Sequence, residues 1–174
     1  MAHYIVKLVE RATFTSSDEH AIQVAVQKKF DEAFAGTSDG VDVSWGSGDP
    51  NDNLVVHFVP DREHSYIKQK WSDANIALEA GGHTYTGARP MAATEVYRRR
   101  DGGDFHFGSY AATVFHEAMH NLYPFQTTNF VHLLDGGGDA AGLAAATYSR
   151  HTAMTDHNKQ LIRQGFSVKN PQYL

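Results

Sequence analysis

A short segment with two histidines and a glutamate places the strongest constraint on this chain. Residues 113–123 read T-V-F-H-E-A-M-H-N-L-Y, and their apolar members recur at the spacing of one helix face. Pro124 cannot continue a helix, so the pattern predicts a half-buried helix that ends at Tyr123. One face of this helix must therefore pack against a core, while the other face carries polar side chains.

The polar face carries the pattern H-E-x-x-H, formed by His116, Glu117 and His120. Residues four apart lie one above the other on a helix, so both imidazoles can point at one metal ion. Zinc is the expected ion, because it binds neutral imidazole at about 2.0–2.1 Å and takes about four ligands. Glu117 is the candidate catalytic residue, since it can take a proton from a metal-bound water. The alternative is a pair of solvent-facing histidines on an ordinary helix.

The composition predicts one soluble globular domain without thiol chemistry. With 41% hydrophobic and 20% charged residues, the chain is expected to fold as a single domain over residues 1–174. It has no cysteine, so a metal site must use His, Asp or Glu. The formal net charge of −5 does not favour a nucleic-acid partner.

No targeting or membrane segment is visible in the sequence. The first residues lack a charged region followed by a long apolar run, so no signal peptide is predicted. No apolar run approaches the about 18 residues of a membrane span, so no membrane partner is expected. The pattern leaves open whether the protein is cytoplasmic or exported, and it does not predict an oligomeric state.

One long helix is predicted near the N-terminus. Ser16 and Glu19 form a capping box, and apolar residues then repeat at helical spacing as far as Phe34. Gly36 supplies the stop signal. The apolar stripe of this helix is expected to belong to the core.

Strands are predicted around that helix from alternating segments rich in β-branched side chains. These segments are residues 4–9, 41–45, 53–59 and 93–99. Residues 76–78 and 83–85 flank a glycine pair and predict a hairpin. Residues 105–107 are expected to pair back across a turn at 101–103, whereas 61–73 carries no clear signal.

The C-terminal part is expected to be helical or irregular. The chain is irregular after Pro124, and residues 140–148 can form a helix. Asp156 is the predicted N-cap of a final helix that runs through Ile162 and ends at Gly165. A helix among strands, followed by a helical half, predicts an α+β fold with an antiparallel or mixed sheet.

Two histidines leave a catalytic zinc site one protein ligand short, because such sites commonly use three protein ligands and a water. His132 is the preferred third ligand, since it precedes the glycine run 136–138, where the chain can bend back under the helix. The other candidates are Asp135, then Asp139, His151 and His157. Without a metal, His132 is an ordinary histidine on an apolar segment. The predicted metal ligands are His116, His120 and His132.

These features resemble the zincin metallopeptidases. The resemblance covers the N-terminal helix, the strands and residues 116–120, and it implies a zincin-like catalytic domain. Such a domain has a twisted mixed sheet over the zinc-binding helix and a mostly helical or irregular C-terminal subdomain that supplies a third ligand. The chain is most similar to metzincins, because 153–155 (A-M-T) resembles the Met-turn below their metal and 156–162 resembles the helix that follows. It departs from their H-E-x-x-H-x-x-G-x-x-H pattern, with Tyr123 and Gln126 at the last Gly and His positions.

The resemblance implies a zinc-dependent metallopeptidase that hydrolyses peptide bonds by Glu117-assisted attack of zinc-bound water. A peptide or protein substrate is expected to add to an edge of the sheet as a further strand. One alternative is a metalloenzyme that acts on another amide, or a non-haem iron enzyme if Asp135 completes the site. The other is a binding module with a structural metal site.

Other polar residues have weaker assignments. Tyr123 and Tyr148 are candidates for stabilising an oxyanion, although a packed or surface tyrosine is the simpler interpretation of each. Asn121 is expected to hydrogen-bond around the helix end. The remaining histidines are interpreted as structural or surface residues: His3, His20, His57, His64, His83 and His106.

Overall fold

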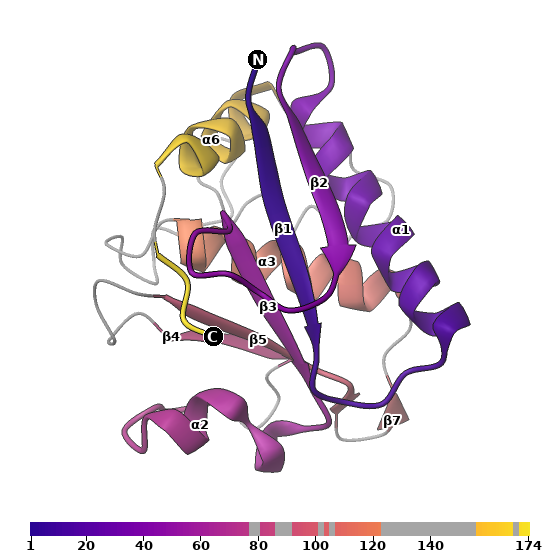
Figure 1. Cartoon of the computed structure of the whole chain (residues 1–174), viewed down its shortest axis with the longest axis vertical. Coiled ribbons are helices and arrows are strands. Elements are labelled where there is room, and N and C mark those ends of the chain that lie inside the picture. Colours follow the sequence, from indigo (N-terminus) through magenta and orange to yellow (C-terminus); the bar gives the residue numbers. More distant parts are fainter. Residues whose placement is uncertain (77–80, 86–91, 101–102, 105–106, 123–155, 169–170) are drawn as a thin grey trace.

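The computed structural model describes residues 1–76, 81–85, 92–100, 103–104, 107–122, 156–168 and 171–174 (Figure 1). The elements are β1 (His3–Glu10), α1 (Ser16–Phe34), β2 (Gly40–Trp45), β3 (Leu54–Val59), a 3-10 turn (Arg62–His64), α2 (Tyr66–Lys70), β4 (Gly82–Tyr85), β5 (Ala93–Tyr97), β6 (Arg99–Arg100), β7 (Gly103–Asp104), α3 (Phe107–Leu122) and α6 (Asp156–Ser167). No helix within these ranges is both long and apolar enough to cross a bilayer.

A five-stranded mixed sheet organises the fold, in the order β2-β1-β3-β5-β4. The strands β2, β1, β3 and β5 are parallel, and only the edge strand β4 runs antiparallel to its neighbour. The helix α3 packs against α1, β4 and β5, whereas α2 packs against β5. The predicted α+β fold with a mixed sheet is therefore confirmed.

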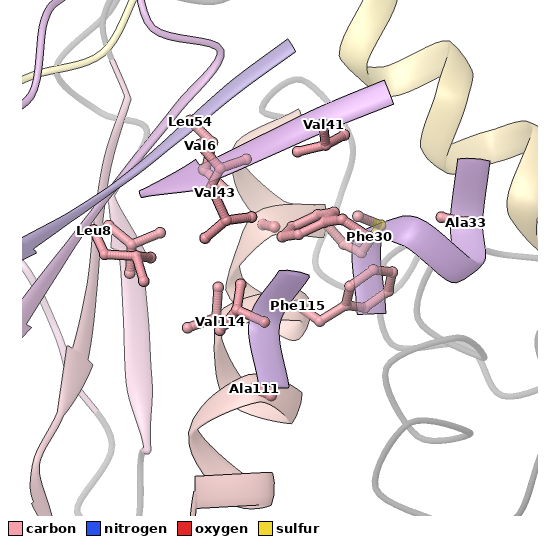
Figure 2. Packing of buried hydrophobic residues seen from close by; sticks show 14 of the residues in the cluster. Val6, Leu8, Phe30, Ala33, Val41, Val43, Leu54, Ala111, Val114 and Phe115 are labelled. Carbon is pink, nitrogen blue, oxygen red and sulfur yellow. The ribbon is translucent and has the colours of Figure 1, made fainter. Parts of the chain in front are cut away.

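The main core lies between the sheet, α1 and α3 (Figure 2). The apolar stripe predicted for the helix at 113–123 is buried, with Val114, Phe115, Ala118 and Met119 each fully enclosed. The ring of Phe115 packs against that of Phe30 of α1, with 5.5 Å between the ring centroids. Each large apolar side chain buried in this way contributes about 1.5–3 kcal/mol, so the contact between these rings helps to hold α3 against α1.

The helices differ from their predicted bounds at the ends. The N-cap of α1 is Thr15, whose hydroxyl accepts a hydrogen bond from the backbone N–H of Asp18, so the predicted capping box at Ser16 is wrong by one residue. The helix α6 continues through Gly165 to Ser167. It does so because the buried Phe166 packs its ring against aromatic rings of β1 and α1, and this burial outweighs the poor helix propensity of glycine.

The helix α3 begins earlier than predicted, at Phe107. Its first turns are anchored by the buried Tyr110, whose hydroxyl donates to the backbone oxygen of Arg98 over 2.9 Å. The expected strand at 105–107 is therefore wrong at Phe107. The chain does pair back after the turn, but through β7, which lies antiparallel to β6.

The predicted hairpin of residues 76–78 with 83–85 lies partly outside the described residues, which omit 77–80. The segment 83–85 does lie in a strand, β4, but this strand pairs with β5, with Thr84 opposite Thr94. The segment 61–73, which carried no clear signal, contains the 3-10 turn and α2. The short helix α2 starts where Ser65 accepts a hydrogen bond from the N–H of Lys68.

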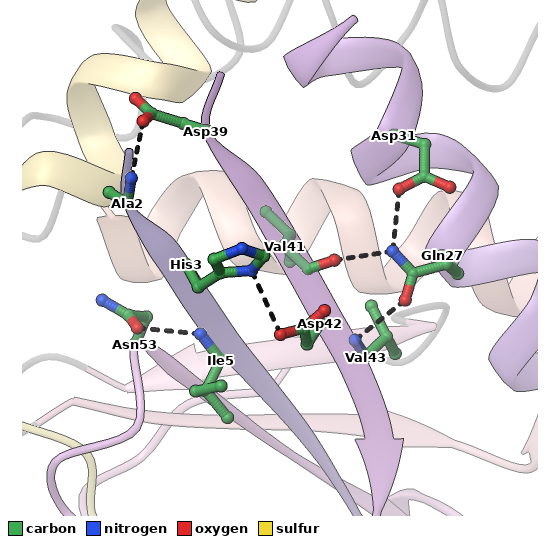
Figure 3. A network of polar contacts seen from close by, with 10 residues as sticks. All are labelled: Ala2, His3, Ile5, Gln27, Asp31, Asp39, Val41, Asp42, Val43 and Asn53. Atoms are coloured by element: carbon green, nitrogen blue, oxygen red, sulfur yellow. Dashed lines mark hydrogen bonds and ion pairs between the residues drawn. The ribbon is translucent and has the colours of Figure 1, made fainter. Parts of the chain in front are cut away.

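One edge of the sheet is bonded by side chains of α1 (Figure 3). Gln27 donates to the backbone oxygen of Val41 over 2.7 Å and accepts from the backbone N–H of Val43 over 2.9 Å. Gln23 donates to the oxygen of Val43 over 2.9 Å. These amides replace the bonds that a further strand would make to β2, so that edge is closed to strand addition at these residues.

A second, smaller core lies between the sheet and α2, and it encloses two ionisable groups. The carboxylate of Glu95 accepts hydrogen bonds from the hydroxyls of Ser65 and Tyr97 and from the N–H of Ile67. His57, interpreted from sequence as structural or surface, is fully buried and therefore structural. Its Nδ1 accepts from Nε of Arg11 over 2.8 Å.

We expect His57 to make the fold sensitive to acid. Burial, and then the charge of Arg11, lowers the pKa of His57 to about 4. The imidazole of the unfolded protein has a pKa near 6.5. The contribution of the neutral, buried His57 to folding stability is therefore fully present above pH 6.5 and is lost as the pH falls towards 4. The loss is about 3 kcal/mol. Glu117 and other groups titrate in both proteins, so the measured quantity is the difference in unfolding free energy between wild type and His57→Gln. Urea unfolding should show that this difference changes by about 3 kcal/mol, to the disadvantage of the wild type, between pH 7 and 4. Parallel curves for the two proteins would contradict the assignment.

Candidate functional site

The H-E-x-x-H residues lie in the last two turns of α3, where the helix crosses β4 and β5. The apolar stripe turns one face of this helix towards α1 and the sheet. His116 and His120 remain partly exposed, whereas Glu117 is 6% exposed. The three side chains therefore differ in environment: two imidazoles reach the surface and the carboxylate between them faces the protein interior.

The two imidazoles converge as the sequence spacing predicts. The Nε2 atoms of His116 and His120 lie 3.3 Å apart, and the ring planes are inclined at 73°. Two nitrogens held at about 2.05 Å from one tetrahedral zinc ion lie about 3.3 Å from each other. Without a metal, the same separation allows a direct hydrogen bond between the rings, in which one Nε2 donates and the other accepts. This separation fits a shared zinc ion.

The carboxylate of Glu117 is held by the edge strand β4. The hydroxyl of Thr84 donates to Oε2 of Glu117 over 2.7 Å. Burial raises the pKa of Glu117 to about 7, the Thr84 hydrogen bond opposes this shift, and the charge of Glu95 adds to it. A carboxylate whose pKa lies near neutrality is suited to accept and return a proton at physiological pH.

A glycine allows this strand to approach the helix. A Cβ atom at Gly82 would lie 2.7 Å from the backbone oxygen of Glu95 and 2.9 Å from Cγ of Glu117. It would also lie 3.1 Å from Cγ2 of Thr113. Any larger residue at this position would force β4 away from α3 or from β5, so the placement of the Glu117 carboxylate depends on the missing side chain.

Asn121 lies one residue before the end of α3, and its side chain is buried in the interior. It is 0% exposed and donates through Nδ2 to Oγ1 of Thr94 over 2.8 Å. Its amide also makes two reciprocal hydrogen bonds with the amide of Gln172. Sequence reasoning missed Thr84, Thr94 and Gln172. A usable signal existed only for Asn121, which is four residues after Glu117 and therefore on the same helix face.

The third metal ligand is not described. Within the described residues no group of three metal-binding side chains occurs. The candidates His132, Asp135, Asp139 and His151 lie outside the described residues, as do Met154, Tyr123, Tyr148 and the predicted helix at 140–148. The side chain of His157, in α6, is also outside the description. The assignment of His132 therefore stays a prediction.

Comparison with known proteins adds no further assignment. No protein-family model, curated protein or solved structure matches the chain. The chemical interpretation of the site therefore depends on its own residues.

The buried carboxylate of Glu117 is expected to reduce stability at neutral and alkaline pH in the metal-free protein. Its folded pKa of about 7 lies above the value of 4.5 that an unfolded glutamate has. The contribution of Glu117 to stability is therefore fully present below pH 4.5 and is lost as the pH rises through 7. Glu117→Gln, which can still accept the Thr84 hydrogen bond, should be more stable than wild type at pH 8 by up to about 3 kcal/mol. Urea unfolding in a chelator at pH 4.5 and 8 measures the difference, and equal stability at pH 8 would show that Glu117 is solvated.

Proposed function

We propose that the chain is a zinc-dependent metallopeptidase with a zincin-like fold. His116 and His120 would bind the metal together with a third ligand, His132, and Glu117 would be the general base. The observation that carries this proposal is the 3.3 Å separation of the two Nε2 atoms beside a buried carboxylate. The position of α3 against one face of a mixed sheet is consistent with the resemblance to zincins.

The chemistry of Glu117 follows from its environment. Zinc, when bound, would supply a Lewis acid that polarises the scissile carbonyl and makes water easier to deprotonate. Glu117 takes the proton from the attacking water and returns it to the leaving amine, as a carboxylate with a pKa of about 7 can do in both directions. A purely structural metal site has no need for such a group, so the buried carboxylate argues against a binding module.

The edges of the sheet favour one path for a peptide. The edge at β2 is bonded by Gln23 and Gln27. Among the described residues, no backbone or side-chain group bonds to the outer side of the β4 backbone. An extended peptide added to β4 would gain backbone hydrogen bonds and pass beside Glu117. The proposed substrate is therefore a peptide or an unfolded protein segment.

The first test of the proposed function is Glu117→Gln. Glutamine has nearly the shape of glutamate but cannot accept the proton, so hydrolysis should fall by at least about 100-fold while zinc stays bound. Hydrolysis of an unfolded protein, measured with bound-metal analysis, checks both statements. A chelator-treated wild-type sample is the control, and near-normal turnover in zinc-loaded Glu117→Gln would remove Glu117 from the mechanism.

The second test concerns the third ligand. His132→Ala should reduce zinc affinity by more than the about 10–100-fold typical of losing an outer hydrogen-bond partner. Because imidazole ligands bind zinc only when neutral, metal release should also move to higher pH in this variant. Asp135→Ala is the matched comparison in a zinc-binding titration. If Asp135→Ala loses the metal and His132→Ala keeps it, the ligand is Asp135, and if both keep it, His151 and His157 are tested next.

A further inference from the structure

A continuous set of hydrogen bonds connects the segment 171–174 to the carboxylate of Glu117. Oε1 of Gln172 accepts from the backbone N–H of Val55 in β3 over 3.1 Å. A backbone N–H can only donate, so this bond identifies the oxygen of the Gln172 amide and leaves its Nε2 facing Oδ1 of Asn121 over 2.8 Å. The orientation of Gln172 in turn determines that of Asn121.

The amide of Asn121 then directs a pair of threonine hydroxyls. Its Nδ2 donates to Oγ1 of Thr94, which lies 3.2 Å from Oγ1 of Thr84. Each hydroxyl has one proton. When Glu117 is ionised, as a general base must be, the Thr84 proton goes to its carboxylate at 2.7 Å in preference to its backbone oxygen at 3.1 Å. The Thr94 proton is then left for Thr84. The donors from Val55 to Glu117 therefore follow one direction, and successive hydrogen bonds of this kind strengthen one another. The one reverse bond runs from Nδ2 of Asn121 back to Oε1 of Gln172 over 2.9 Å and closes the pair of amides.

We infer that Thr84 is a positioning residue for Glu117. A series of hydrogen bonds that runs from Val55 through Gln172, Asn121 and Thr94 holds its hydroxyl in the donor orientation. This inference rests on the proposed function. The last bond of this series goes to Oε2 of Glu117, and among the described residues no donor bonds to its Oε1. Oε1 is the oxygen left to accept the proton of the attacking water, because the hydroxyl of Thr84 is bonded to Oε2.

The kinetic test compares three variants of the zinc-loaded protein. Thr84→Val keeps the shape of the side chain and removes the donor, so kcat should fall by about 10–100-fold with KM and zinc content unchanged. Thr84→Ser keeps the hydroxyl and should retain a kcat close to that of the wild type. Thr37→Val is the matched control, because it removes a 2.8 Å hydrogen bond to Phe34 far from the site and should leave kcat unchanged.

Two kinetic results would overturn the inference. If Thr84→Val keeps the wild-type kcat, the hydroxyl does not position Glu117. If Thr84→Ser loses as much activity as Thr84→Val, the lost property is packing by the Thr84 methyl group and not hydrogen bonding.

A double-mutant cycle, measured by thermal unfolding, tests the same contact without an activity assay. Thr84→Val should lower the Tm of the metal-free wild-type protein by more than it lowers the Tm of a Glu117→Ala background, where the acceptor is absent. Equal Tm shifts in the two backgrounds would refute the contact. A zinc-loaded wild-type protein that hydrolyses no peptide would refute the proposed function, and the cycle would still decide whether Thr84 holds Glu117.

Discussion

The close approach of β4 to α3 is the contact on which the candidate site depends. It requires a residue without a side chain at Gly82, since a Cβ there would overlap Glu117 and the backbone of Glu95. The approach removes the carboxylate of Glu117 from water and brings the hydroxyl of Thr84 within 2.7 Å of it. The raised pKa of Glu117 and its fixed orientation therefore have one cause, the contact between a strand and a helix.

Local patterns predicted the elements better than their partners. The apolar repeat of α1 and the stripe of α3 were read correctly because each depends on spacing along one helix. The pairing of residues 83–85 with β5 was not predicted, because a β partner is chosen by tertiary contacts that a short segment does not encode. The C-terminal end of α6 was misplaced for a related reason, since Phe166 extends the helix through packing against distant aromatic rings.

In the candidate site too, features set by local spacing were predictable and features set by tertiary contacts were not. The convergence of His116 and His120 follows from helix geometry alone and was predictable. The buried state of Glu117 was not, because the burial comes from a strand more than 30 residues earlier, as the separation of Thr84 and Glu117 shows. Gln172 is still more remote, being 51 residues from Asn121, so no motif spacing relates the two. Residue type could identify the chemistry here, but only the fold shows what surrounds it.

The glutamines of α1 that bond to β2 also limit how copies of this protein can associate. Growth of a sheet from one molecule to the next without end requires two exposed strands on every molecule. Here Gln23 and Gln27 already bond to the backbone groups of Val41 and Val43 at the β2 edge. Two copies that joined through β4 would therefore each use the one edge strand that is still open to pairing. Such an association is self-limiting at a two-fold pair, and it would fill the same path that a peptide takes past Glu117.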